Sequence, residues 1–264
     1  MLGKLPVSRI STVKQNLNRE CFEQQPGRRF VYGFSVTVDE FQLFYFDRSG
    51  AVEIETIDIH QDAVIFVQLV RFLAHPNLST LGFDPRVYWD GDQRHIDILS
   101  GDCVIKYDID NLMFQHRAIF GSGTICWVAR ETGTKTQVVI KDKWRGEEFG
   151  PEADLLTAAE AAGTPGIACL LVIDEAFVGG QCLTTSSLRE SQYLDVTEHK
   201  NRVFSRVVLE LYGPSIRNFK SGLQLLQAFR DSIESTFFCA LPYLSADMRG
   251  CSPLSSGQGW HPSS

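Results

Sequence analysis

A pair of closely spaced glycines and a strand-terminal lysine are the residues of this sequence whose types and spacing could do chemistry. The segment Phe120-Gly121-Ser122-Gly123-Thr124 could bring its backbone close to phosphate groups, because glycine tolerates tight turns. Lys141 ends the apolar run Val138-Val139-Ile140, 18 residues after Gly123. A lysine at the end of a buried strand needs anions around its ammonium, and nucleotide phosphates would supply them.

Each of these features also has a plainer explanation. Taken alone, Gly-x-Gly is more typical of a hairpin turn, and a strand-terminal lysine is more often a solvated one. A Rossmann motif would need a third glycine and a following helix, but Cys126 occupies that place and the next residues alternate like a strand. The sequence contains no Gly-Lys-Ser or Gly-Lys-Thr, which excludes a Walker phosphate loop.

A third candidate, Glu152, lies in the first turn of a helix predicted over Pro151–Ala162. Proline is favoured at a helix start, and a glycine follows the predicted end. Glu152 precedes Leu155 and Leu156 by three and four residues, so it borders the inward face and could reach Lys141. The plainer alternative is a first-turn glutamate that is favoured only by the helix dipole.

The elements around these candidates follow a definite order. Apolar alternation and turn residues predict strands at Leu112–Phe120, Thr124–Glu131, Thr136–Lys141, Ala168–Ile173 and Arg206–Leu211, with a last helix at Gly222–Phe238. A polar insertion, Asp174–Arg202, separates the last two strands. A glycine turn between strands, a strand-terminal lysine, a helix with an inward-edge glutamate and two further strands form the order that a protein kinase small lobe requires.

The preceding region is predicted to be rich in β-structure. Alternating apolar residues predict a β-meander over Arg29–Ile59, and a helix is predicted over Asp62–Leu73. Short strands are expected near Ile96–Leu99 and Cys103–Ile109. We place a domain boundary near Asn111, where the order of the predicted elements changes.

Four segments of the chain resemble the fungal-type protein kinase family. They are Phe46-Asp47-Arg48-Ser49-Gly50-Ala51, Leu81-Gly82-Phe83-Asp84-Pro85, Val139-Ile140-Lys141-Asp142-Lys143-Trp144 and Arg206-Val207-Val208-Leu209-Glu210. The resemblance covers roughly residues 28–234. It implies an α+β fold: a protein-kinase-like N-lobe, with a five-stranded antiparallel sheet and an αC-type helix, is preceded by a β-rich module and followed by a partial helical C-lobe.

The expected domain organisation follows from this resemblance and from composition. It comprises an N-terminal segment, helical or disordered (1–27), a β-rich upstream module (28–111), a kinase-like small lobe (112–213), the start of a helical large lobe (214–240) and a disordered tail (241–264). The tail is expected to be disordered because serine, glycine and proline dominate it and apolar periodicity is weak.

By resemblance, the cofactor is ATP with Mg²⁺ and the substrate is a protein serine or threonine. Val128 would press on the adenine ring and Leu209 would close the rear of the pocket. The connector Glu210–Tyr212 would bind adenine through its backbone. Lys141 would neutralise phosphates and Glu152 would orient it. The predicted cofactor-binding residues are Gly121, Gly123, Thr124, Val128, Val139, Lys141, Glu152, Leu209, Glu210 and Tyr212.

The catalytic residues are the part of the family pattern that is missing. In kinases the His-Arg-Asp loop and the Asp-Phe-Gly motif follow the helix that here begins at Gly222. Neither motif is recognisable, and Asp247 is only a weak candidate for the catalytic aspartate. Ser252 stands where the metal-binding asparagine is expected, so no metal ligand is predicted.

The sequence therefore predicts a kinase family member that retains only the nucleotide-binding half and is inactive alone, through truncation or an incorrect gene model. Two alternatives stay open. The chain could be a pseudokinase or a module that binds another protein, or it could be a non-functional fragment that cannot fold by itself.

Composition excludes several other classes of function. The formal charge is −7, and lysine and arginine form no cluster, so nucleic acid is not expected as a partner. No signal peptide and no long apolar run is visible, which predicts an intracellular protein, cytoplasmic or nuclear, without a membrane span. The seven cysteines include no Cys-x-x-Cys pair, so they are expected to be reduced and not to bind zinc.

Overall fold

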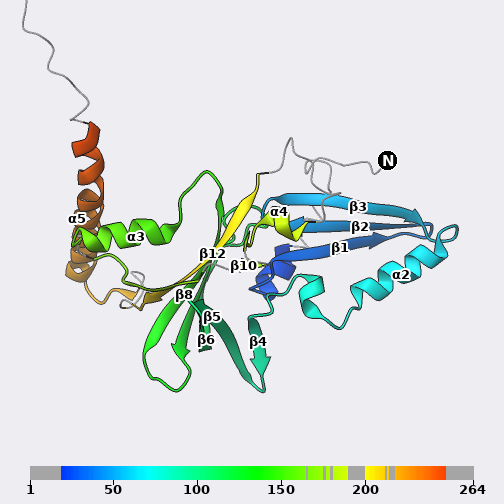
Figure 1. The fold of residues 1–264 in the computed structure, drawn as a ribbon, viewed down its shortest axis with the longest axis horizontal. Coiled ribbons are helices and arrows are strands. Elements are labelled where there is room, and N and C mark those ends of the chain that lie inside the picture. The colour runs from blue at the N-terminus through cyan, green and yellow to red at the C-terminus, as the bar shows by residue number, and fades with distance from the viewer. Residues whose placement is uncertain are drawn as a thin grey trace, which may run out of the picture. The chain divides into compact units, whose positions relative to one another are not determined.

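The computed structural model describes residues 19–164, 166–174, 177–178, 181–189, 200–211, 213 and 218–247 (Figure 1). The chain divides into two compact units. The first comprises residues 1–154 and 169–211, and the second comprises residues 155–168 and 212–264. Every predicted site residue except Tyr212 and Asp247 falls in the first unit.

A three-stranded antiparallel sheet confirms the predicted β-meander. It is formed by β1 (Phe30–Val36), β2 (Glu40–Asp47) and β3 (Gly50–Asp58), in that order. Strand alternation sends Phe41 and Tyr45 to the face that packs against helix α2 (Ala63–Leu73), as Figure 1 shows. Phe44 and Phe46 face the other way and pack against Phe22, in the helical residues 19–24.

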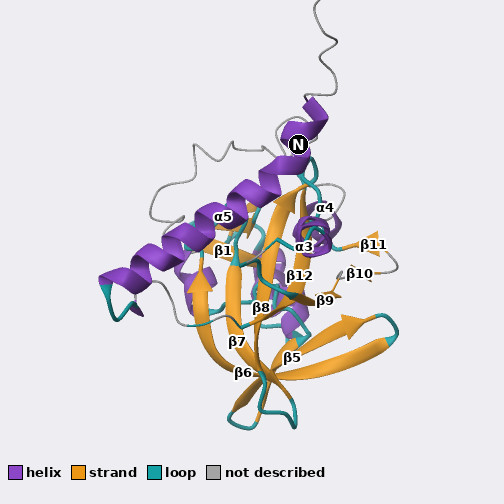
Figure 2. Cartoon of the chain, turned by 90° about the vertical axis from the view of Figure 1, so that its left-hand side faces the viewer, coloured by secondary structure: helices purple, strands orange, loops and turns teal. Residues whose placement is uncertain are grey.

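A seven-stranded antiparallel sheet carries the candidate site. Its order is β4-β5-β6-β7-β8-β12-β9, and Figure 2 shows β6, β7 and β8 side by side. The strands are β4 (Val87–Asp90), β5 (Gln93–Ser100), β6 (Cys103–Gln115), β7 (Ile125–Glu131), β8 (Gln137–Gly146), β9 (Leu170–Asp174) and β12 (Arg202–Glu210). The core on one face is built around Ile96, Trp127, Ile140 and Val208, all 1% exposed or less.

The α+β class is confirmed, but the sheet has seven strands where five were predicted. The strand β6 has 13 residues: Cys103–Ile109 pair with β5, and Tyr107–Gln115 pair with β7. The boundary predicted near Asn111 therefore lies inside a strand that both halves of the sheet share. Apolar alternation shows that strands exist on either side of Asn111, but it does not show that one hydrogen-bonded ladder continues through it.

Two further element boundaries differ from the prediction. The strand predicted at Leu112–Phe120 ends at Gln115, because residues 116–124 form a loop. The last helix, α5 (Gly222–Asp247), continues past Phe238, so residues 241–247 are helical and not part of a disordered tail. The rest of the predicted tail, residues 248–264, lies outside the described residues, as do residues 1–18 of the predicted N-terminal segment.

The remaining elements are short. They are η2 (Leu78–Leu81), α3 (Glu152–Ala161), β10 (Phe177–Val178), β11 (Gln181–Cys182) and α4 (Thr185–Leu188). The helix α3 begins directly after Pro151 and matches the prediction within one residue at each end. Of the helices in the described residues, none is both long and apolar enough to cross a bilayer.

Candidate functional site

An ion pair joins strand β8 to the first turn of α3. The strand alternates, with Ile140 and Asp142 buried on one face and Lys141 on the other. The Nζ atom of Lys141 lies 2.5 Å from Oε1 of Glu152, and the side chains are 24% and 25% exposed. The predicted lysine and glutamate are thus brought together on a partly covered face.

A second lysine reaches the same carboxylate. The Nζ atom of Lys143 lies 3.6 Å from Oε2 of Glu152, so one carboxylate serves two ammonium groups. Lys143 was not among the predicted site residues, because the strand predicted to end at Lys141 continues to Gly146 and so puts both lysines on one face. This face therefore carries more positive charge than was predicted.

Three predicted apolar residues are aligned across neighbouring strands. In the sheet register Val139 of β8 lies opposite Val128 of β7 and opposite Leu209 of β12. Directly opposed residues share a face, and Lys141 is two residues further along β8 on that same face. The side chains of Val128 and Leu209 are 9% and 8% exposed. An apolar strip thus ends beside the Lys141–Glu152 pair.

The glycine turn has the backbone that was predicted but contacts that were not. Gly121 and Gly123 have φ values of 110° and 49°. The Gly121 N–H donates to the Arg48 carbonyl at 2.9 Å, and the Trp144 N–H donates to the Ser122 carbonyl at 2.7 Å. A Cβ atom at Gly123 would overlap the Arg48 guanidinium, whereas one at Gly121 would meet no atom within 4 Å.

These contacts lie on the side of the sheet away from Lys141. Gly123, Asp142 and Trp144 line one small pocket, and Asp142 and Trp144 alternate with the lysines along β8. The Thr124 hydroxyl bonds to the Ser122 hydroxyl at 3.0 Å, within the turn itself. Close packing on Arg48 is thus a sufficient reason for glycine at position 123. A phosphate-covering role for the turn stays a prediction.

The two glycines are expected to respond differently to alanine. Both positions require a left-handed backbone, which costs a non-glycine residue on the order of 1 kcal/mol or more. Only at Gly123 would the added methyl also displace a buried guanidinium. Urea unfolding is therefore expected to show a larger loss of stability for Gly123→Ala than for Gly121→Ala. Equal losses would mean that Arg48 moves aside without cost.

The Arg48 side chain holds the loop before this turn. It is 2% exposed, and its Nη1 donates to the carbonyls of Ala118 and Ile119 at 2.9 and 3.1 Å. The guanidinium also stacks on the Phe22 ring, 4.2 Å from its centroid. Burial lowers the pKa of Arg48 to about 10, because a charge without a surrounding solvent shell is disfavoured.

Cys126 occupies the place of a third glycine and lies opposite Lys141 in the register. Burial raises the pKa of its thiol, although the neighbouring Lys141 ammonium acts in the other direction. The thiol is therefore protonated at neutral pH and does not compete with Glu152 for the lysine.

A buried arginine, Arg206, joins three of the four segments that resemble the fungal-type protein kinase family. Arg206 is 1% exposed, and its guanidinium donates to both Asp142 oxygens at 2.6 and 2.8 Å and to Asp84 Oδ2 at 3.0 Å. Arg29 donates to the other Asp84 oxygen at 2.8 Å. Burial opposes the charge on Arg206, but the carboxylates of Asp142 and Asp84 raise its pKa above the ordinary value. Burial alone would raise the pKa of Asp84, yet Arg206 and Arg29 hold it below the usual range.

A second buried pair joins the segment around Asp47 to the insertion that follows β9. Arg189 Nε and Nη2 donate to the two Asp47 oxygens at 2.6 and 2.7 Å. Oδ1 of Asp47 also accepts from the backbone N–H groups of Ser49 and Gly50 at 2.8 and 3.0 Å. The upstream segments thus form part of the same folded body as β8 and β12, with charged groups at the junctions.

A model of fungal protein kinases matches residues 9–237 of the chain. The chain belongs to the fungal protein kinase family. No curated protein and no solved structure matches it. In this fungal protein kinase family member, the strands β6, β7 and β8 precede α3, so Lys141 lies on the third strand and pairs with the following helix. Protein kinases place their phosphate-binding lysine and its glutamate partner in the same way.

The ion pair and the apolar strip do not include the other candidate residues of this family member. Glu210 is exposed at the end of β12, and Tyr212 lies outside the described residues. Asp247 is the last residue of α5, in the second unit. Among the described residues no three His, Cys, Asp or Glu side chains are grouped to hold a metal ion.

Proposed function

We propose that this chain binds ATP on the sheet face that carries Lys141. The observation that supports the proposal most directly is the ion pair between Lys141 Nζ and Glu152 Oε1 at 2.5 Å. A lysine that is held by a carboxylate on a partly covered face is oriented before a ligand arrives. Lys141 would then neutralise phosphate oxygens, while Glu152 keeps the ammonium in position.

The apolar strip supports a ligand orientation in which the phosphates lie at Lys141. Val128, Val139 and Leu209 form an apolar strip, and purine rings are commonly bound against apolar side chains. Neighbouring residues on one strand face are about 7 Å apart, so a base over Val139 would direct its phosphates toward Lys141. The family implies ATP as the nucleotide, with Mg²⁺ that would offset phosphate charge when bound.

We propose further that the residues of this chain bind the nucleotide without efficient phosphoryl transfer to a protein serine or threonine. Transfer depends on an aspartate that orients the hydroxyl and on carboxylates that hold the metal. Neither the His-Arg-Asp nor the Asp-Phe-Gly motif is recognisable in the sequence. The loss of such groups costs about 10³-fold or more in rate.

A thermal-shift titration with ATP tests nucleotide binding. A ligand that binds only the folded state raises the melting temperature with concentration. The shift is expected to be larger for ATP than for adenosine, because adenosine lacks the groups that Lys141 would contact. No shift at about millimolar ATP, where a typical nucleotide site is filled, would remove ATP binding from the proposal.

A further inference from the structure

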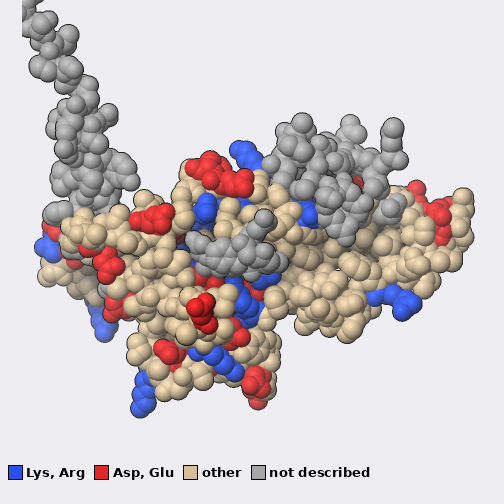
Figure 3. All heavy atoms as spheres, viewed as in Figure 1, with Lys and Arg blue, Asp and Glu red and all other residues tan. Residues whose placement is uncertain are grey.

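The strand β8 carries three cations on one face. Lys141, Lys143 and Arg145 alternate with the buried side chains of Asp142 and Trp144, so they leave the sheet in the same direction. Successive cations are about 7 Å apart along the strand. On the face in view in Figure 3, lysine and arginine are interspersed with aspartate and glutamate. A row of three cations is therefore a distinct feature in a chain of charge −7.

Among the described residues, one carboxylate forms ion pairs with this row of cations. Glu152 pairs with Lys141 at 2.5 Å and more loosely with Lys143 at 3.6 Å. In the part of the chain that the structure describes, Arg145 forms no ion pair, and its Nη1 donates to the Phe149 carbonyl at 2.6 Å. Three positive charges and one negative charge leave an excess that an anion would offset.

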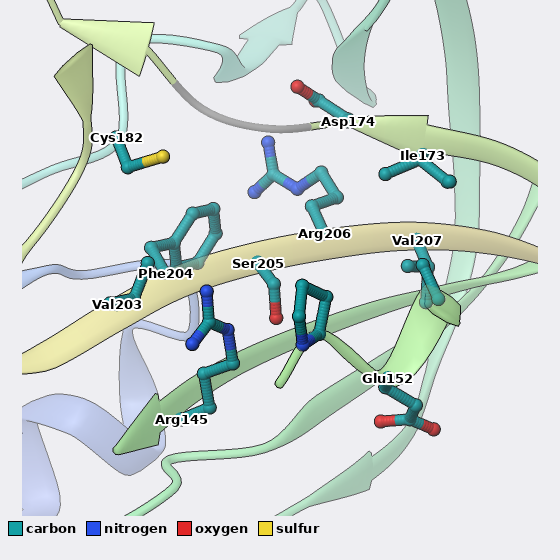
Figure 4. Close-up of a pocket in the computed structure, with 12 residues that line it drawn as sticks. Arg145, Glu152, Ile173, Asp174, Cys182, Val203, Phe204, Ser205, Arg206 and Val207 are labelled. Carbon is teal, nitrogen blue, oxygen red and sulfur yellow. The ribbon is translucent and has the colours of Figure 1, made fainter. Parts of the chain in front are cut away.

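A pocket lies at the Arg145 end of the row. Arg145, Glu152 and Ser205 line it, and Figure 4 shows these side chains at its wall. The Nε atom of Arg145 is buried and has no hydrogen-bond partner among the described residues. Ser205 lies opposite Lys143 in the register, and its hydroxyl donates to the Lys143 carbonyl at 3.3 Å. The cavity itself has a volume of only about 20 Å³, so a phosphate group would lie at its mouth and not inside it.

We propose that Lys143 and Arg145 bind a phosphate group at the mouth of this pocket, beside the nucleotide site and separate from it. A phosphate monoester carries close to two negative charges and three acceptor oxygens, which match one ammonium and one guanidinium. Arg145 Nε is a further donor at the pocket wall. The group could belong to a phosphorylated side chain or to free phosphate, and the chemistry of recognition is the same. The proposal does not require that ATP binds at Lys141.

Calorimetry on the full chain without nucleotide tests the site. The probes are a short peptide with one phosphoserine, the same peptide without phosphate, and inorganic phosphate. We expect the phosphopeptide to bind and the unmodified peptide not to bind. Lys143→Met and Arg145→Met should each weaken binding about tenfold or more, the usual effect of losing a charge-assisted hydrogen bond. Arg145→Lys should restore part of the loss, and Lys135→Met, in the exposed hairpin loop, should change nothing.

The three probes distinguish free phosphate from a phosphorylated side chain. The variants distinguish the proposed site from the nucleotide site at Lys141. Binding by inorganic phosphate alone, with the same dependence on Lys143 and Arg145, would support the site and assign it to a free anion. Loss of phosphopeptide binding in Lys141→Met but not in Arg145→Met would overturn the proposal, because the phosphate would then occupy the nucleotide site. Equal binding of both peptides would overturn it as well. The ATP titration is a separate measurement, so either proposal can fail alone.

Discussion

Replacing Arg206 by methionine is expected to lower the free energy of unfolding by about 3–5 kcal/mol, because it leaves buried carboxylates without their cation. Both Asp142 oxygens and one Asp84 oxygen lose their donor at a position that is 1% exposed. Urea unfolding of the wild type and of Arg206→Met measures the difference. A loss of this size is a large fraction of the stability of an ordinary domain.

A matched control and a double-mutant cycle make this result specific. Arg130 pairs with Asp110 at 2.6 Å on the surface, so Arg130→Met should cost about 0–1 kcal/mol. Asp142→Asn together with Arg206→Met should cost less than the sum of the single changes, since the two groups interact directly. Additive losses, or a loss for Arg206→Met no larger than for Arg130→Met, would contradict a stabilising role for the buried network.

The network also predicts the direction of the pH dependence. The pKa of Asp84 is lowered in the folded state, so its contribution is present above its unfolded pKa, about 4, and is lost as the pH falls through the folded value. The penalty of Arg206→Met should therefore shrink at acid pH, where Asp84 is protonated and no longer needs a cation.

Replacing Lys141 by methionine is expected to remove most of the stabilisation that ATP gives. A ligand at 100 times its dissociation constant stabilises by about 2.7 kcal/mol, and a 100-fold loss of affinity leaves only about 0.4 kcal/mol. Methionine keeps the length and the apolar stem of lysine but cannot neutralise phosphate. The thermal shift of Lys141→Met against ATP concentration, at constant ionic strength, gives the affinity directly.

Two controls accompany this change. Lys135→Met removes an exposed lysine from the hairpin loop and should leave the ATP shift as in the wild type. Glu152→Gln keeps a hydrogen-bond acceptor near Lys141 but removes the charge, so an intermediate loss of affinity is expected. An unchanged ATP shift in Lys141→Met would show that the nucleotide, where it binds, does not contact this ammonium.

Much of the element order could be predicted from the sequence. The helix α3 follows from a proline at its start and a glycine after its end, and β7 and β12 follow from apolar alternation. The pairing of Lys141 with Glu152 could be predicted because the strand and the helix are adjacent in sequence. The length of β6 could not, because alternation is a local signal whereas strand pairing depends on distant residues.

The burial of the charged residues could not be predicted from the sequence. Asp142 and Arg206 look like surface residues, because charged side chains are rarely fully buried unless they are paired. Their pairing depends on the register of β8 against β12, in which Arg206 lies opposite Asp142. Lys143 was not predicted because the strand was expected to end at Lys141, whereas β8 continues to Gly146 and puts both lysines on one face.

The shared strand β6 links structural changes in β4 and β5 to the sheet face that carries Lys141. Its first half is a ladder partner of β5, its second half is a ladder partner of β7, and the middle of the strand takes part in both ladders. Local opening of the upstream hairpin would expose an unpaired edge beside the strands that carry Val128 and Lys141. Shortening or replacing residues 87–109 is therefore expected to disturb the strands β7 and β8 as well, so the two regions form one structural block.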